Sequence, residues 1–131
     1  MAGTRITGEG VLSWPLGRTT GRGFACGYNG GLPCARGAIK ALLAFALIAP
    51  MERSPLVQRA IDQGVEFLLS RDPVVADYPA GWQGRTSPLW FRLGFPLGYA
   101  ADLLQNLEAL VAVGSARDAR LGNAIDFIVS R

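Results

Sequence analysis

The sequence predicts an all-α fold of four main helices, arranged as two helical hairpins joined by long loops rich in Gly, Pro and aromatic residues. Three observations lead to this prediction. Apolar residues recur three and four positions apart in four segments, which is helical spacing. Capping residues, prolines and glycines stand at the ends of those segments. The two halves of the chain also match when the sequence is shifted by 64 residues, so we expect repeated hairpins and no sheet.

Length and composition indicate one domain, because 131 residues suffice to bury a core. Basic residues are spread along the whole chain, without the run or stripe typical of nucleic-acid binding, so no nucleic acid partner is expected. The longest apolar run, Ala41–Pro50, is far shorter than the ~20 residues of a membrane-spanning helix. The N-terminus lacks the apolar region of a signal peptide, so we expect a cytoplasmic protein without a membrane span.

Residues 1–33 are expected to form a Gly-rich N-terminal loop region, since a mid-helix glycine costs about 0.5–1 kcal/mol relative to alanine. A first hairpin follows over residues 34–72. Its first helix should begin near Pro33, because proline suits the first helical position, and should end at Pro50. Ser54–Pro55 supplies an N-cap and a first-turn proline for the second helix. That helix should stop at Asp72–Pro73, because the residue before proline disfavours the α region.

Residues 73–96 are expected to be an aromatic loop, and residues 97–131 a second hairpin. Its first helix should run from Leu97 to Val113, with Gly114 as its C-terminal stop. Asp118 should cap the fourth helix.

The two hairpins are interpreted as copies of one unit. With the shift of 64 residues, the N-cap Ser54 aligns with Asp118. The first copy then carries four extra residues, about one helical turn. Beyond them, Glu66–Arg71 matches Asp126–Arg131. Units of this kind bury their apolar faces on neighbouring copies.

The loop Gly23–Ala35 and the phrases Arg53–Ile61 and Gly64–Asp72 resemble bacterial proteins of the prenyltransferase and squalene-cyclase repeat superfamily. Members have the terpenoid-cyclase-like α/α toroid, in which some six hairpins close around an apolar cavity. The resemblance implies that this chain is a portion of the later part of such a toroid.

The catalytic motifs of that superfamily are missing from the sequence. Class II triterpene cyclases protonate their substrate through an Asp-x-Asp-Asp motif, and protein prenyltransferases bind zinc through Asp, Cys and His. This sequence has no such aspartate cluster, no histidine and no Gln-x3-Gly-x-Trp signature. No catalytic residue can therefore be carried over, and no cofactor is expected.

Cys26 and Cys34 are candidate metal ligands, although no histidine is present to complete a zinc site. Cys34 is also a candidate catalytic thiol, because a helix N-terminus favours the thiolate. The alternative is that both are small buried residues of a tight loop.

Asp102 is a further candidate catalytic residue. It lies with Tyr99 on one face of the third helix, near the helix start, and in toroids such starts lie near the mouth of the cavity. The alternative is a solvated aspartate at the positive end of a helix dipole. Aromatic residues of the 73–96 loop either line an apolar pocket or fill the core between hairpins. The candidate ligand-binding residues are Tyr99, Trp82, Trp90, Tyr28 and Asn29.

The leading functional hypothesis is a binding or assembly module with an apolar cavity or groove and no catalytic activity. One alternative is an isoprenoid-handling enzyme completed by another chain, and a second is a thiol or metal protein that uses Cys26 and Cys34. The partners expected are an apolar, isoprenoid-like ligand and a second copy of the chain, most simply as a dimer. The dimer is expected because apolar residues nearly encircle the first helix. These residues are Leu42, Leu43, Phe45, Leu47 and Ile48.

Overall fold

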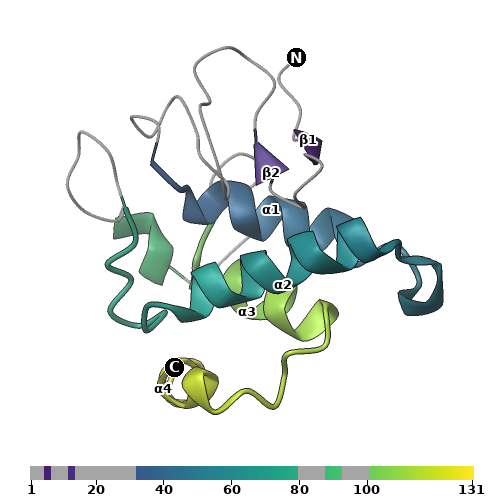
Figure 1. Ribbon diagram of the computed structural model, residues 1–131. Coiled ribbons are helices and arrows are strands. Elements are labelled where there is room, and N and C mark those ends of the chain that lie inside the picture. Colours follow the sequence, from purple (N-terminus) through teal and green to yellow (C-terminus); the bar gives the residue numbers. More distant parts are fainter. Residues whose placement is uncertain (1–4, 7–11, 14–31, 80–87, 93–100) are drawn as a thin grey trace.

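The computed structural model describes residues 5–6, 12–13, 32–79, 88–92 and 101–131. Within these residues the chain is all-α (Figure 1), which confirms the predicted fold class. The four α-helices are α1 (Ala35–Phe45), α2 (Pro55–Leu69), α3 (Leu103–Ala112) and α4 (Gly122–Val129). Three short 3₁₀ helices accompany them: η2 (Pro50–Glu52), η4 (Pro88–Phe91) and η5 (Ala119–Leu121).

A small antiparallel pairing joins β1 (Arg5–Ile6) to β2 (Leu12–Ser13), so the expectation of no sheet is wrong in this detail. β1 lies next to α2.

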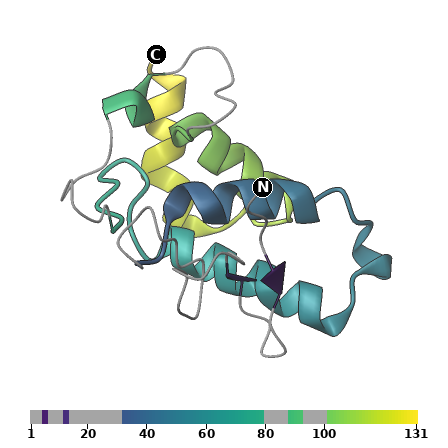
Figure 2. The ribbon, with the colours of Figure 1, turned by 90° about the horizontal axis from the view of Figure 1, so that it is seen from above.

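The helices are arranged around α1, which contacts both α2 and α3, while α3 also contacts α4. Figures 1 and 2 show α1 and α3 running in the same direction and α2 running back against α1. Figure 1 shows α4 nearly end-on, so it crosses α3 and does not run back along it, and the second pair of helices is packed differently from α1 and α2.

The core lies where α1, α2 and α3 meet, and its aliphatic side chains are almost completely removed from solvent. Burial of each such side chain contributes about 1.5–3 kcal/mol relative to leaving it exposed. The largest of them are Ile39, Leu42, Ile61, Leu68, Leu103 and Leu110.

The first helix begins close to its predicted start near Pro33 but ends earlier than the sequence predicted. Cys34 is its N-cap, so Pro33 lies outside the helix. At the other end α1 stops at Phe45 and not at Pro50, which begins η2 instead. Leu47 is 88% exposed, so beyond Phe45 no apolar contact with the core favours further helix. Leu47 and Ile48 therefore lie outside the helix, although they were expected to be part of its apolar surface.

The second helix agrees with its predicted caps. The Ser54 hydroxyl accepts a hydrogen bond from the Val57 N–H at 3.2 Å, and Pro55 is the first helical residue. The helix ends at Leu69, shortly before Asp72–Pro73.

The third helix begins at Leu103 and not at Leu97. Asp102 is its N-cap and has extended backbone angles, so Asp102 itself lies outside the helix, while residues 97–100 of the predicted helix lie outside the described residues. At its C-terminal end, Gly114 has φ of +100°, and the Ser115 N–H donates to the Leu110 carbonyl at 2.8 Å. This left-handed glycine confirms the predicted stop.

The fourth helix is capped by Asp118, as predicted, but its first turn is 3₁₀ (η5) before α4 continues. In the first hairpin, α2 has 15 residues. In the second hairpin the corresponding elements are η5, with 3 residues, and α4, with 8 residues. The difference equals the four-residue insertion seen in the sequence of the first copy. No helix in the described ranges is long and apolar enough to cross a membrane.

We expect Gly114→Ala to lower the free energy of unfolding by about 1–2 kcal/mol, because an L side chain is strained at positive φ. Urea denaturation measures the change. Gly122→Ala is the matched control, since Gly122 is the first residue of α4, has φ of −52° and has open space where a Cβ would lie. An equal loss of stability in both variants would contradict the explanation.

Candidate functional site

A group of polar side chains, buried except for the half-buried Lys40, lies where α3 faces α1 and the segment 73–79. We call it the interior polar cluster, and its members are Lys40, Tyr78, Asp102, Gln105 and Asn106. Asp102, Gln105 and Asn106 are only 2%, 6% and 0% exposed. Buried polar groups are costly unless they are hydrogen-bonded, so the partners of each member decide what the cluster can do.

Asp102 acts as a helix cap. Its carboxylate Oδ1 accepts a hydrogen bond from the Gln105 N–H at 2.8 Å, which satisfies one of the unpaired donors at the start of α3. Because the side chain is 2% exposed, the expectation of a solvated aspartate is wrong. The helix start alone accounts for an aspartate here.

Lys40 connects α1 to α3. Its Nζ donates to Gln105 Oε1 at 2.5 Å. Burial lowers the pKa of Lys40, while the negative charge of Asp102 raises that pKa and the positive charge of Arg36 lowers it. A polar link of this kind between two apolar helix faces favours one register, because sliding the helices breaks the bond.

Tyr78 connects the end of α2 to α3. Its hydroxyl donates to the Leu68 carbonyl and accepts a hydrogen bond from Asn106 Nδ2 at 3.3 Å. Burial raises the pKa of Tyr78 to about 12. The phenol is therefore neutral at physiological pH and serves as a joint between two elements.

Aromatic rings form one wall of the cluster. The Tyr78 ring lies 5.6 Å from that of Trp90 and 5.9 Å from that of Phe67, measured between centroids. Trp90 Nε1 donates to the Pro73 carbonyl at 2.9 Å, and the side chain is buried. Trp90, a candidate ligand-binding residue, thus fills the core between the hairpins.

The first hairpin is apolar at the positions where the second is polar. With the shift of 64 residues, Asp102, Gln105 and Asn106 align with three buried residues of α1. These are Ala38, Ala41 and Leu42. Sequence reasoning missed Gln105, Asn106 and their partners Lys40 and Tyr78, although comparison of the two copies contains a signal for the first two.

Cys34 lies at the N-terminus of α1, as expected, and is buried. Its Sγ accepts a hydrogen bond from the Gly37 N–H at 3.5 Å, so the thiol caps the helix. The described ranges contain no group of three or more Cys, Asp or Glu side chains placed to hold a metal ion. The remaining candidates lie outside the described residues: Cys26, Tyr28, Asn29, Trp82 and Tyr99.

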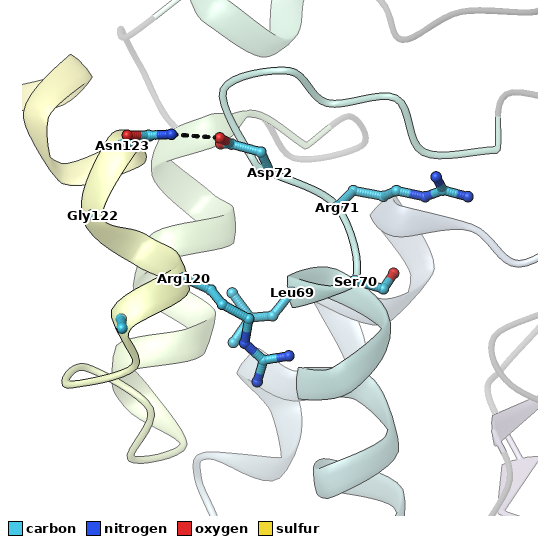
Figure 3. A pocket seen from close by; sticks show the side chains of 8 residues that line it. Leu69, Ser70, Arg71, Asp72, Arg120, Gly122 and Asn123 are labelled. Atoms are coloured by element: carbon cyan, nitrogen blue, oxygen red, sulfur yellow. Dashed lines mark hydrogen bonds between the residues drawn. The ribbon is translucent and has the colours of Figure 1, made fainter.

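An open pocket of about 300 Å³ lies between the C-terminal end of α2 and the start of the fourth helix (Figure 3). Arg120, on its wall, is held by Glu66 through two bonds of 2.9 and 3.0 Å and also by Asp118. Asn123 Nδ2 donates to Asp72 Oδ2 at 2.8 Å, as Figure 3 shows. These bonds join the two hairpins across the pocket, and the charge of Arg120 is balanced by carboxylates.

The outer face of α4 carries exposed apolar side chains. Ile125 and Val129, one helical turn apart, are 45% and 78% exposed. The rest of the helix packs on the core through Ala124, Phe127 and Ile128. Figures 1 and 2 place α4 at the edge of the described helices, on the far side of α3 from α1.

Comparison with protein-family models, curated proteins and solved structures finds no match to this chain. The resemblance to the toroid superfamily therefore stays a prediction, and function has to be inferred from the geometry described above.

We expect the free energy of unfolding to fall as the pH rises from about 10 to 12. The folded state holds the proton of Tyr78 with a pKa of about 12, above the ordinary value of about 10, so its contribution is complete below pH 10 and is lost as the pH rises. Urea denaturation at pH 9 and pH 11 measures the change. Tyr78→Phe should have a lower free energy of unfolding than the wild-type protein at pH 9, and this free energy should fall less between pH 9 and pH 11. An identical fall in both proteins would show that Tyr78 does not cause it.

We expect Arg120→Gln to raise the pKa of Asp118 from about 2 toward the ordinary value of about 3.9, because hydrogen bonds from Arg120 stabilise the ionised carboxylate. Carbon-detected NMR titration of the Asp118 carboxyl follows this change. Arg117→Gln is the control, since it removes a neighbouring exposed charge but leaves the Arg120 bonds in place. A low pKa that persists in Arg120→Gln would show that another group causes the shift.

Proposed function

We propose that this chain is a helical-repeat assembly module without catalytic activity, which binds a second copy of itself through the outer face of α4. The observation that carries the proposal is the exposure of Ile125 and Val129 on a helix whose other apolar residues belong to the core. Exposed apolar side chains that extend a core face are typical of surfaces that become covered by a partner.

The repeat supports this interpretation. Ile125 aligns with Ile61 at the shift of 64 residues, and Val129 aligns with Leu69 after the four-residue insertion. Ile61 and Leu69 are only 1% and 4% exposed. The same positions of the repeat are thus buried in the first hairpin and open in the second. In repeat proteins an open terminal face of this kind is covered by another unit or by a cap.

A second copy fits this face because the row of apolar residues is short and self-complementary. In a two-fold dimer the same patch is buried on both subunits. An antiparallel contact between the two α4 helices would bring Ile125 opposite Val129 of the partner subunit. Asp102 and Cys34 are the candidate catalytic residues. Both cap helices, so a structural role accounts for each of them.

The apolar, isoprenoid-like ligand has weaker support than the protein partner. The open pocket between α2 and the fourth helix is lined mainly by polar and charged residues, which do not suit a hydrocarbon. The large exposed apolar side chains of the described residues lie instead on the outer faces of helices and in connecting segments, away from this pocket.

We expect the wild-type protein to have twice its chain mass of 13.9 kDa in light scattering at micromolar concentration. The double variant Ile125→Lys/Val129→Lys should be a folded monomer, because a charge at each position opposes burial of the face.

Leu47→Lys is the matched control. Leu47 is 88% exposed and its repeat counterpart Val111 is 53% exposed, so this position is open in both hairpins and is not part of the inferred contact. A wild-type protein that stays monomeric on concentration would overturn the proposal. Loss of the dimer in Leu47→Lys would place the interface elsewhere.

A further inference from the structure

Asn106 is the most completely buried polar side chain of the described residues, with no exposed surface. Its Nδ2 donates to the Tyr78 hydroxyl at 3.3 Å. Its Oδ1 is buried and has no hydrogen-bond partner in the part of the chain that the structure describes. One half of the amide is thus satisfied and the other half is not.

The orientation of this amide is fixed by its neighbour. The Tyr78 hydroxyl has a single proton, which it donates to the Leu68 carbonyl. It can therefore only accept from Asn106. Rotating the amide by half a turn would place two acceptor oxygens against each other. Asn106 Oδ1 consequently points away from Tyr78, toward a position where a donor is required.

The bond from Nδ2 to Tyr78 accounts for one half of this amide, and the fold supplies no donor for the other half, Oδ1. The equivalent residue of the first hairpin is Leu42, which is equally buried. Leaving a buried carbonyl oxygen unpaired costs about 1–3 kcal/mol, whereas leucine at the same place costs nothing of this kind. A donor beside Oδ1 removes that cost, so the full benefit of asparagine over leucine is reached when such a donor is bound.

We propose that Asn106 Oδ1 and its surroundings form a binding site for a neutral hydroxyl group, which donates its hydrogen bond to Oδ1. A neutral donor fits better than a charged one. The Lys40 ammonium and the Asp102 carboxylate, both bonded to the adjacent Gln105, carry opposite charges, so the cluster has no net charge to attract an ion. A carboxylate group has no proton to donate.

Two sources offer this chemistry, a buried water molecule and the hydroxyl of a small alcohol. Both are small enough for an interior position, and a buried water typically makes about three hydrogen bonds to groups of this kind. The proposal is the hydroxyl site itself, and the experiment distinguishes its two occupants.

The first measurement is a crystal structure of the wild-type protein at a resolution that shows ordered water. We expect an oxygen atom at about 2.7–3.0 Å from Asn106 Oδ1. In Asn106→Leu, which introduces the residue of the first hairpin, that oxygen should be absent. Oδ1 without any neighbouring oxygen, or Oδ1 bonded to a donor of the protein, would overturn the proposal. This result needs only the wild-type protein, so it stands even if the variant does not fold.

The second measurement titrates the wild-type protein with 2-propanol and follows the side-chain NH₂ signals of Asn106 by NMR. The Tyr78 ring signals are followed in both the wild-type protein and Asn106→Leu, because the variant has no amide. A saturable shift in the wild-type protein that is absent from Asn106→Leu shows that the site takes an alcohol. No saturable shift, together with the ordered oxygen, shows that water is the occupant. Dimerisation enters neither measurement, so failure of this proposal and failure of the assembly proposal are distinguishable.

Discussion

Burial of α1 between α2 and α3 is the interaction on which the rest of the described structure depends. Its inner face contains Ala38, Ile39 and Leu42, none of which is exposed. Alanine at the first of these positions lets helices approach closely, and the larger residues fill the remaining space. Because α1 contacts both helices, loss of this face would separate the first hairpin from the second.

The interior polar cluster imposes order on that apolar contact. Apolar surfaces attract without direction, whereas the Lys40–Gln105 bond has one geometry and links α1 to α3. The Tyr78 hydroxyl in the same way holds the segment after α2 against α3. The cluster thus adds register and orientation to a core whose stability comes from aliphatic burial.

The fourth helix is held differently. Its connections to the first hairpin include the exposed Arg120–Glu66 pair and the Asn123–Asp72 bond. Exposed ion pairs contribute little stability, because water and salt screen them. Only one edge of α4 packs on the core, and its other apolar edge is open. This weakly covered end is where an additional helical partner would contribute most.

The sequence by itself determined the fold class, the four helices and most of their caps, because helical spacing and capping are local properties of a few neighbouring residues. Ser54, Gly114 and Asp118 are examples whose predicted roles are confirmed. The ends of α1 and the start of α3 were decided by tertiary contacts, since a helix continues only where its apolar face is covered. Tertiary contacts also decided which residues form the candidate site. The Lys40–Gln105 and Tyr78–Asn106 bonds join residues 65 and 28 positions apart, and only the folded chain brings such residues together.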